Sequence, residues 1–299
     1  MNKTDTAAAS LAGGALLPLI LAPLLWAGNF AVGRIVHLDI APLPLNALRW
    51  AAAAALLLPV LLWHRRAVWR TLRERWRAVL LLSGLGVVGF NTVLYAGLAR
   101  TTASTAGVVF GLTPLLILLC ARLAGGRAPA RTELGGALVA FAGVALVIGG
   151  AIGWTGAASL GALIVLAAAL IWTAYTLALR HMPLGLPPLP ALGLQAAVGA
   201  AIMLPFVPHA EAAAVLARPE GVAAVAYLAL GASILAFCFW LSGVARAGPQ
   251  RAGAFLNLIP VFSVLLGAAL LGERPGPLQL AGLGLVVGGV TTVQLRPVP

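Results

Sequence analysis

Long apolar segments alternate with short polar or basic connections along the whole chain. Ten segments can be marked, covering residues 15–35, 43–63, 78–98, 102–124, 132–151, 158–180, 187–207, 221–243, 249–271 and 277–295. A helix of about 20 residues is about 30 Å long, which matches the hydrocarbon core of a bilayer. The pattern therefore predicts an all-α integral membrane protein with ten transmembrane helices. The segments are about twice as long as the roughly 10-residue strands of a membrane β-barrel, so that fold is excluded.

The second half of the chain repeats the first at a fixed offset of 146 residues. The stretch from Leu98 to Pro129 corresponds to the stretch from Val244 to Pro275, and the prolines in their middles, Pro114 and Pro260, coincide. Over 52 aligned positions that begin with these stretches, 14 residues are identical without a gap, which is more than this composition gives by chance. Further matched pairs are Trp26 and Trp172, Arg34 and Arg180, Pro42 and Pro188, Pro44 and Pro190, and Pro59 and Pro205. The pattern indicates a duplication.

Each repeat contains five apolar segments, which is an odd number. Corresponding helices of the two repeats must therefore cross the membrane in opposite directions, as in the inverted repeats of transporters. We expect a five-helix repeat in residues 1–151, an inverted five-helix repeat in residues 152–299, and one membrane domain formed by both. In such proteins, a proline-interrupted apolar segment at matching places in the two halves indicates the binding site.

The composition supports a membrane protein and predicts its orientation. The chain is 62% hydrophobic and 9% charged, which leaves too few charged residues to cover a soluble domain. Its net charge of +12 comes from basic residues in the connections, of which 14 lie on the side of the two termini and 4 on the opposite side. By the positive-inside rule both termini are cytoplasmic. We expect a multi-pass protein of a bacterial-type inner (plasma) membrane.

The basic connection at residues 64–77, HRRAVWRTLRERWR, is interpreted in the same way. It places Val68, Leu72 and Trp76 at helical spacing, which is typical of a helix that lies on the anionic inner leaflet. Basic residues between membrane spans signal topology, so no nucleic-acid partner is expected. The expected partners are the lipid bilayer and a small-molecule substrate.

Aromatic and polar residues share one helical face in the first and sixth apolar segments. Trp26, Asn29 and Phe30 are spaced i, i+3 and i+4, and Trp172 and Tyr175 are the counterparts of the first two. Such a face is poorly suited to lipid tails and suits a cavity that holds an amphipathic solute; ordinary packing between helices is the alternative. We expect a mid-membrane substrate cavity lined by Trp26, Asn29, Phe30, Asn91, Tyr95, Phe110, Trp172, Tyr175, Phe237, Trp240 and Asn257.

Pro114 and Pro260 interrupt the fourth and ninth apolar segments. A proline inside a helix removes one backbone hydrogen bond and frees a carbonyl one turn earlier. In a bilayer that carbonyl needs another partner, and Thr113 and Asn257 can either provide it or line the cavity. Because the repeat is inverted, the two prolines break helices that run in opposite directions. We therefore predict that they are hinges for two gates, one at each side of the membrane.

Arg49 is the charged residue that lies well inside an apolar segment. An arginine at the bilayer centre costs about 2.5–3.5 kcal/mol on insertion scales. Because Arg49 is about a turn and a half from Pro44, the favoured interpretation is structural, with the side chain snorkelling to the outer interface. The alternative is a gating role or a contact with a substrate carboxylate. Its counterpart in the second repeat, Gln195, is uncharged.

Several kinds of chemistry are missing from the apolar segments. The Asp and Glu residues lie at segment ends or in connections, so the buried carboxylate of a cation/proton antiporter is absent. No basic cluster lies at mid-depth to neutralise a phosphate. Neither a metal site nor a cofactor nor an intramembrane enzyme is expected, because the histidines lie near segment ends without metal-ligand spacing; they are His37, His64, His181 and His209.

Glycines form small-residue stripes in the fifth and tenth segments, at Gly135, Gly136 and Gly143 and at Gly282, Gly284, Gly288 and Gly289. Small residues let two membrane helices approach closely. Packing within one chain is the favoured interpretation, and a homodimer contact is the alternative. The protein is therefore expected to be a monomer or a homodimer.

Four sequence motifs resemble those of a known family. They are WAGNF at 26–30, LRW at 48–50, TTASTAGVVFGLTP at 101–114 and AGAFLNLIPVFSVLLGAALLGERP at 252–275. Together with the ten segments, they resemble the drug/metabolite transporter superfamily, specifically its EamA-type ten-helix exporters. The resemblance implies export of small metabolites, commonly amino acids, by alternating access around a central cavity. The first repeat departs from the pattern, with Arg127 where the second has Glu273.

Within that family, the aromatic amino-acid exporters look most similar, given Trp26, Tyr95, Trp172, Tyr175 and Trp240. We therefore expect an inner-membrane transporter that exports small metabolites, most of all neutral or aromatic amino acids. Without a buried carboxylate, it is expected to move substrate downhill or with loose coupling. A multidrug or organic-cation exporter is the main alternative, followed by an intramembrane enzyme and a membrane scaffold that transports nothing.

Overall fold

The computed structural model describes residues 16–37, 39–123, 131–150, 156–247, 252–253 and 255–294. Every regular element in these ranges is a helix, which confirms the all-α prediction. Each of the ten apolar segments is helical over most of its described residues. The expected repeat boundary at 151/152 and the basic residues Lys3, Arg127, Arg251 and Arg296 lie outside the described residues.

The helices of the first half are α2 (Leu16–Ile35), α3 (Pro42–Leu56), α4 (Leu58–Trp63), α5 (Arg65–Glu74), α6 (Trp76–Leu82), the π-helix η1 (Ser83–Gly89), α7 (Phe90–Leu98), α8 (Ala103–Phe110), α9 (Thr113–Leu123) and α10 (Arg131–Gly150). Those of the second half are α11 (Ala157–His181), α12 (Pro188–Met203), the 3-10 helix η2 (Leu204–Phe206), α13 (His209–Leu216), α14 (Pro219–Ala226), the π-helix η3 (Tyr227–Leu235), α15 (Ala236–Ala247), α17 (Leu258–Leu271) and α18 (Pro277–Gln294).

Several helix boundaries recur at the offset of 146 residues. α3 and α12 begin at the matched prolines Pro42 and Pro188, which is a favoured place for proline because the first helical residue needs no N–H donor. α10 and α18 also begin at matched residues, and η1 and η3 end at matched residues. The π-helical segments were not anticipated from the sequence. They widen the middle of two corresponding helices, a feature often found at functional sites.

Six helices are long and apolar enough to cross a membrane in the part of the chain that the structure describes. They cover Leu16–Ile35, Trp76–Leu98, Ala103–Cys120, Ala158–His181, Pro188–Phe206 and Pro219–Ala247. Three shorter apolar helices cover Leu134–Val147, Leu258–Leu271 and Pro277–Thr292. Large apolar side chains such as Leu138 and Leu270 are more than half exposed, as expected for a surface that faces lipid.

The segment expected as one helix over 43–63 is split in two. α3 ends at Leu56 and α4 begins at Leu58, with Pro59 in the first turn of α4. The proline lacks the N–H that would continue the backbone ladder, which accounts for the break. The basic connection forms α5 as predicted, whereas Trp76 belongs to the next helix, α6.

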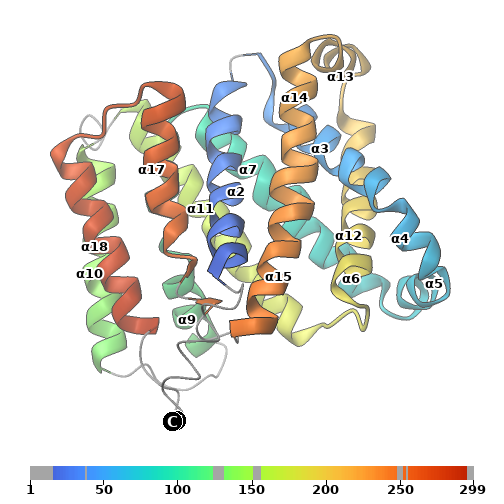
Figure 1. Ribbon diagram of the computed structural model, residues 1–299, viewed down its shortest axis with the longest axis horizontal. Coiled ribbons are helices and arrows are strands. Elements are labelled where there is room, and N and C mark those ends of the chain that lie inside the picture. Colours follow the sequence, from blue (N-terminus) through green and yellow to red (C-terminus); the bar gives the residue numbers. More distant parts are fainter. Residues whose placement is uncertain are drawn as a thin grey trace.

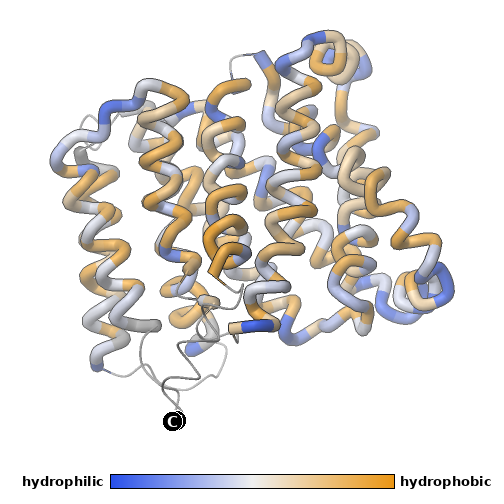
Figure 2. The backbone as a smooth tube through the Cα atoms, viewed as in Figure 1, coloured by the Kyte–Doolittle hydropathy of each residue, from blue (hydrophilic) through white to orange (hydrophobic). Residues whose placement is uncertain are grey.

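The helices stand side by side in the order seen in Figure 1. α10 and α18 form one edge, α17 and α2 lie next to them, and α4 and α5 form the opposite edge. The most extensive packing joins α10 to α18, α17 to both α2 and α8, α11 to α7, and α12 to α3. Hydrophobic residues colour most of each helix in Figure 2, and hydrophilic residues gather at the bends and on α5.

The glycine stripes of α10 and α18 pack against each other within the chain. A Cβ atom built on Gly143 would lie 2.7 Å from the carbonyl oxygen of Gly282, and one built on Gly289 would lie 2.4 Å from that of Gly136. Backbones this close leave no room for side chains. The favoured interpretation, packing within one chain, is confirmed for these four glycines. No neighbour lies within 4 Å of a Cβ built on Gly284.

This packing predicts a difference between two substitutions on the same helix. Gly282→Ala places a methyl group 2.5 Å from a Val147 methyl and 2.6 Å from the Gly143 carbonyl oxygen, so we expect a loss of about 1–3 kcal/mol in the free energy of unfolding. Gly284→Ala meets nothing and is expected to be neutral or slightly stabilising. Thermal unfolding of the purified protein in detergent measures both. Equal melting temperatures for the two variants would contradict the packing.

Candidate functional site

The side chain of Arg49 lies at the centre of a buried polar network. Arg49 is on α3 and is 4% exposed. Its Nη1 donates to Asn29 Oδ1 on α2 at 2.9 Å, and to Asn91 Oδ1 and Tyr95 Oη on α7 at 2.8 and 2.6 Å. Its Nε donates to Ser233 Oγ on η3 at 2.9 Å. One guanidinium group therefore joins three helices of the first half to one of the second.

Further hydrogen bonds hold the partners of Arg49 in place. Tyr95 Oη donates to Asn29 Oδ1 at 2.8 Å. Ser233 Oγ donates to the carbonyl of Leu228, five residues earlier in the π-helix, which leaves its lone pairs for Arg49. All partners are neutral amides or hydroxyls, and each is at least 94% buried. A donor with five N–H groups in a fixed plane thus meets a preformed set of acceptors.

The favoured interpretation of Arg49, snorkelling to the outer interface, is wrong. The side chain turns into the bundle and finds neutral acceptors on α2, α7 and η3. These hydrogen bonds replace the water that the charged group would otherwise need, so the side chain does not have to reach the headgroups. These acceptors could not be predicted from the sequence, because Ser233 lies 184 residues away from Arg49.

A row of aromatic rings runs beside the polar network. The ring centroids of Phe30 and Phe110 are 5.6 Å apart, those of Phe110 and Phe90 are 5.5 Å apart, and those of Phe90 and Trp172 are 4.8 Å apart. Trp172 continues to Tyr175 at 5.0 Å. The row contains rings from α2, α7, α8 and α11. Two of its rings, Phe30 and Phe90, are sequence neighbours of the polar residues Asn29 and Asn91. Tilted rings at these distances attract one another through their quadrupoles.

The remaining predicted residues lie outside this row. Trp26 packs on Trp240 of α15, with ring centroids 5.7 Å apart. Phe237, also on α15, is half-buried and makes no aromatic ring contact within the described chain. Asn257 precedes α17 and donates to Thr291 Oγ1 of α18 at 2.9 Å. The structure therefore joins seven of the eleven predicted cavity residues through the network and the row, pairs Trp26 with Trp240 separately, and leaves Asn257 and Phe237 outside both.

Tyr175 and Gln195 are the residues 146 positions after Asn29 and Arg49. The Gln195 amide donates to the Ala191 carbonyl of its own helix, α12, at 3.2 Å. The ring of Tyr175 lies against η1, where a Cβ built on Gly86 would be 2.6 Å from it. Arg49 thus bonds across to α2, whereas Gln195 bonds within its own helix, and only the first half carries a charge at this position.

Both proline-containing helices are interrupted immediately before the proline. Residues 111–112 separate α8 from α9, and residues 256–257 precede α17. Thr113 Oγ1 donates to the Phe110 carbonyl at 2.6 Å, which is the carbonyl that Pro114 leaves without its helical partner. The structural interpretation of Thr113 is thereby confirmed. In the second half, the Leu256 carbonyl accepts from the Ile259 N–H at 3.0 Å instead.

Four residues near this centre were missed in the sequence. Phe90 bridges the aromatic row, Ser233 accepts from Arg49, and the Trp50 ring lies 5.0 Å from the Arg49 guanidinium carbon. Tyr227 donates to the Leu25 carbonyl at 2.9 Å. Trp50 could have been predicted from the sequence, because it directly follows Arg49. Nothing in the sequence distinguishes the other three from other residues of apolar helices. They lie near Arg49 because helices that are distant in the sequence pack together.

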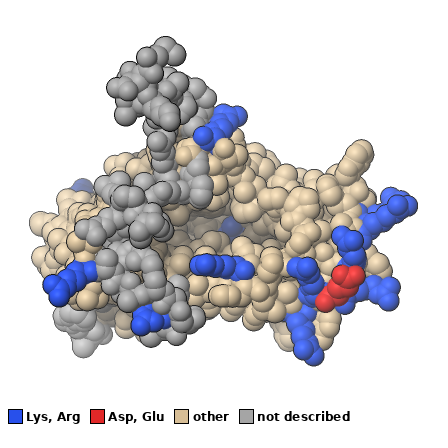
Figure 3. Space-filling view, turned by 90° about the horizontal axis from the view of Figure 1, so that it is seen from below, with Lys and Arg blue, Asp and Glu red and all other residues tan. Residues whose placement is uncertain are grey.

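At the upper end of the bundle in Figure 1, polar contacts join the first half of the chain to the second. Glu273 accepts from the backbone N–H groups of Ala103 and Ser104 at 2.8 and 3.0 Å, which are free donors in the first turn of α8. Asp39 and Arg218 form a salt bridge of 2.9 Å at the same end. Seen from the opposite end, the molecule is hollowed near its middle, and basic side chains gather on that face over α5 (Figure 3).

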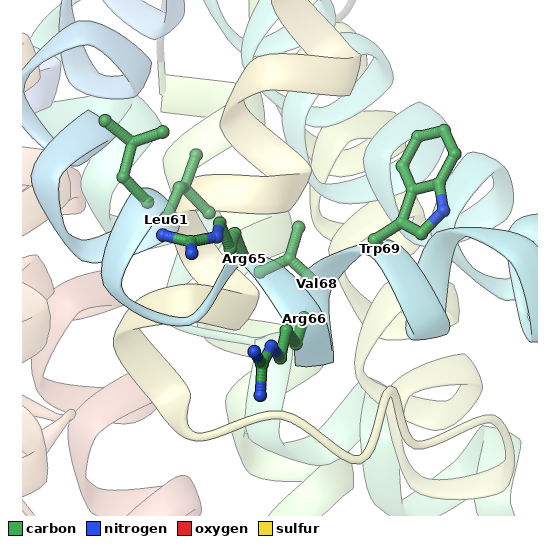
Figure 4. A pocket seen from close by; sticks show the side chains of 6 residues that line it. Leu61, Arg65, Arg66, Val68 and Trp69 are labelled. Atoms are coloured by element: carbon green, nitrogen blue, oxygen red, sulfur yellow. The ribbon is translucent and has the colours of Figure 1, made fainter.

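A further hollow lies away from the polar network, on the bend between α4 and α5. It has a volume of about 510 Å³ and is lined by Leu61, Leu62, Arg65, Arg66, Val68 and Trp69 (Figure 4). Trp69 is 61% exposed. Two arginines and an exposed tryptophan next to apolar side chains suit the headgroup level of a membrane, in agreement with the position predicted for this segment.

A bundle of apolar helices with a polar and aromatic centre is the architecture of a membrane transporter. The chain matches the model of the EamA-like transporter family over residues 13–149 and again over residues 159–294. The protein belongs to the EamA-like transporter family. It is therefore a multi-pass membrane transporter and not an enzyme, as the sequence motifs implied.

Similar proteins support the same class. A probable terminal-alkyne amino-acid exporter of Streptantibioticus cattleyicolor is 28% identical over 287 residues, which are 94% of each chain. The inner membrane transporter YedA of Escherichia coli K12, which is uncharacterized, is 28% identical over 94% of this chain and 90% of its own. A solved crystal structure covers 94% of this chain and 96% of its own, with a TM-score of 0.63 and 26% identity.

The polar network predicts a specific loss of stability. Ser233→Ala removes the acceptor of Arg49 Nε and leaves a charged donor unpaired, so we expect the free energy of unfolding to fall by about 1–3 kcal/mol. Ser263→Ala is the matched control, because the Ser263 hydroxyl donates to the Ile259 carbonyl of its own helix. Its expected loss is below about 1 kcal/mol. Thermal unfolding of both variants in detergent measures these losses. A smaller loss of stability in Ser233→Ala than in Ser263→Ala would contradict a stabilising role of the network.

Proposed function

We propose that the protein exports neutral amino acids, above all aromatic ones, across the inner membrane by alternating access. The observation that carries the proposal is the polar network around Arg49 beside the aromatic row from Phe30 to Tyr175. A solute with a polar backbone and an aromatic side chain matches both surfaces. One relative is named a probable amino-acid exporter, which supports this substrate class.

The proposal includes a substrate cavity between two halves. It is lined by the predicted residues that gather around Arg49 and along the aromatic row, together with Phe90 and Ser233. Residues 1–151 and 152–299 are then inverted repeats of five transmembrane helices each. Two facts support the repeats: helix boundaries recur 146 residues apart, and the family matches two segments whose first residues are 146 apart.

The orientation follows from the distribution of charge. The face of Figure 3, with its basic side chains, is cytoplasmic in this proposal, and α2 begins and α18 ends on that side. The end closed by Glu273 and by the salt bridge of Asp39 with Arg218 is then the outer end. The protein is therefore in an inward-facing state, ready to load substrate from the cytoplasm.

Pro114 and Pro260 are the hinges of this proposal. Each follows an interruption of its helix, so a change of backbone angles there breaks few additional hydrogen bonds. The interruption before Pro260 separates α17, which leads to Glu273 at the outer end, from the residues that precede it. Arg49 contributes to gating because its hydrogen bonds join α3 to η3 across the two halves.

An exporter of organic cations is the second candidate. The aromatic row suits such cations too. The buried charge of the centre is positive, however, and among the described side chains no carboxylate forms an ion pair with Arg49. A cation would be repelled there, so amino acids are favoured over cations.

Counterflow in proteoliposomes tests the proposed function. Vesicles preloaded with unlabelled L-phenylalanine should accumulate labelled L-phenylalanine transiently, without an imposed pH gradient, because no buried carboxylate couples transport to protons. Empty liposomes are the control. Counterflow of a quaternary ammonium compound but of no amino acid would contradict the proposal, and strict dependence on a pH gradient would contradict uncoupled transport alone.

Substitutions at the proposed cavity should impair this counterflow. Trp172→Ala removes a ring that contacts both Phe90 and Tyr175, and Phe110→Ala removes the ring between Phe30 and Phe90. We expect the transport rate to fall by about tenfold in each, the effect of losing one good contact with the substrate. Trp63→Ala and Trp69→Ala are the controls, since these side chains are 88% and 61% exposed. Equal losses in all four variants would argue against the cavity.

A further inference from the structure

The guanidinium of Arg49 is positively charged and has only neutral partners. Its four acceptors are the amides of Asn29 and Asn91 and the hydroxyls of Tyr95 and Ser233. No described Asp or Glu side chain forms an ion pair with it. An arginine in a protein does not lose its proton, so the charge is permanent. Neutral hydrogen bonds solvate this charge but do not neutralise it, so an anion that reaches the site is attracted to it.

One edge of the same guanidinium has no acceptor. Nε and Nη1 make all the hydrogen bonds that Arg49 has within the described chain, and Nη2, with two N–H groups, makes none. Nη2 is also absent from the polar atoms that are both unpaired and sealed from solvent, so it retains accessible surface. The small part of Arg49 that stays accessible, in a side chain that is 96% buried, thus includes its unpaired edge.

A second donor of the polar network, the Asn29 amide nitrogen, is also unpaired. Asn29 Oδ1 accepts from Arg49 Nη1 and from Tyr95 Oη, which determines the orientation of the amide. Its Nδ2 then points away from these two donors and has no acceptor within the described chain. Like Nη2, it is not sealed from solvent. Within the described chain, the centre therefore presents two unpaired hydrogen-bond donors, one of them charged.

We propose that Arg49 Nη2 and Asn29 Nδ2 bind the carboxylate of the transported solute. This inference rests on the proposed function and narrows it: the substrates are molecules with a free carboxylate, and amides, esters and organic cations are excluded. The aromatic row continues from Phe30, the residue after Asn29, so a ring attached near the carboxylate lies against Phe30, Phe90 and Phe110. Arg49 then recognises the acid group, and the row recognises the side chain.

Two pairs of probes that differ only in the acid group test the inference. They are L-phenylalanine against L-phenylalaninamide, and benzoate against benzamide, each titrated into the purified protein in detergent and followed by intrinsic tryptophan fluorescence. A charge-assisted hydrogen bond to a carboxylate corresponds to about a tenfold to hundredfold gain in affinity. We expect each acid to bind the wild-type protein more tightly than its amide by that factor. Equal affinities for acid and amide would overturn the inference without any variant.

Variants locate the effect. Arg49→Gln should lower the affinity for each acid to that of its amide and leave the affinity for the amides unchanged. Arg49→Lys keeps the charge but not the planar fork, so it should retain part of the preference. Arg100→Gln is the charge-matched control, because Arg100 is exposed and donates to the Ala96 carbonyl outside the network. Undiminished preference for acids in a folded Arg49→Gln would overturn the assignment.

The two claims fail in different ways. If benzoate binds through Arg49 but no amino acid shows counterflow, the carboxylate site is supported and amino-acid export is contradicted. If amino acids show counterflow and the acid preference survives in Arg49→Gln, export stands and this site falls.

Discussion

A permanent charge buried in an apolar bundle is the constraint on which the rest of the structure depends. Arg49 would cost about 2.5–3.5 kcal/mol at the bilayer centre if it were unsupported. Instead, α2, α7 and η3 are placed so that Asn29, Asn91, Tyr95 and Ser233 surround it within 2.9 Å. The π-helical turn of η3 brings Ser233 into position, and its hydroxyl takes its own partner from the widened turn. The helices nearest the charge thus serve a polar centre as well as an apolar packing surface.

The same backbone irregularities recur in the two halves, but the charged side chains do not. Both third spans contain a π-helix, and both fourth spans are interrupted before a proline. The charge, however, is on one side only, where Arg49 is matched by Gln195. Glu273 is likewise one-sided, closing the upper end on the first turn of α8. Repeated backbone features suit a motion shared by both halves, whereas the unequal side chains suit one asymmetric solute.

The helices could be predicted from the sequence because apolar length and proline position are local properties. α3 and α12 begin one residue from the predicted segment starts at 43 and 187, and pairing with the freed Phe110 carbonyl was one of the two roles considered for Thr113. The grouping of Asn29, Asn91 and Tyr95 also agrees with the predicted cavity face. The position of the Arg49 side chain could not be predicted, because its acceptors come from helices 20 to 184 residues away. Phe90 was missed for the same reason: nothing in an apolar run distinguishes a ring that meets Trp172 from one that meets lipid.

The account's central claim is that the buried charge of Arg49 faces the transported solute. The most direct measurement is an experimental structure of the protein with L-phenylalanine bound, in which the distance from Arg49 Nη2 to the ligand is read. We predict a carboxylate oxygen about 2.7–2.9 Å from Nη2, with Nη1 still bonded to Asn29 and Asn91. A ligand whose carboxylate lies elsewhere, or an Arg49 side chain extended to the outer interface, would contradict the claim.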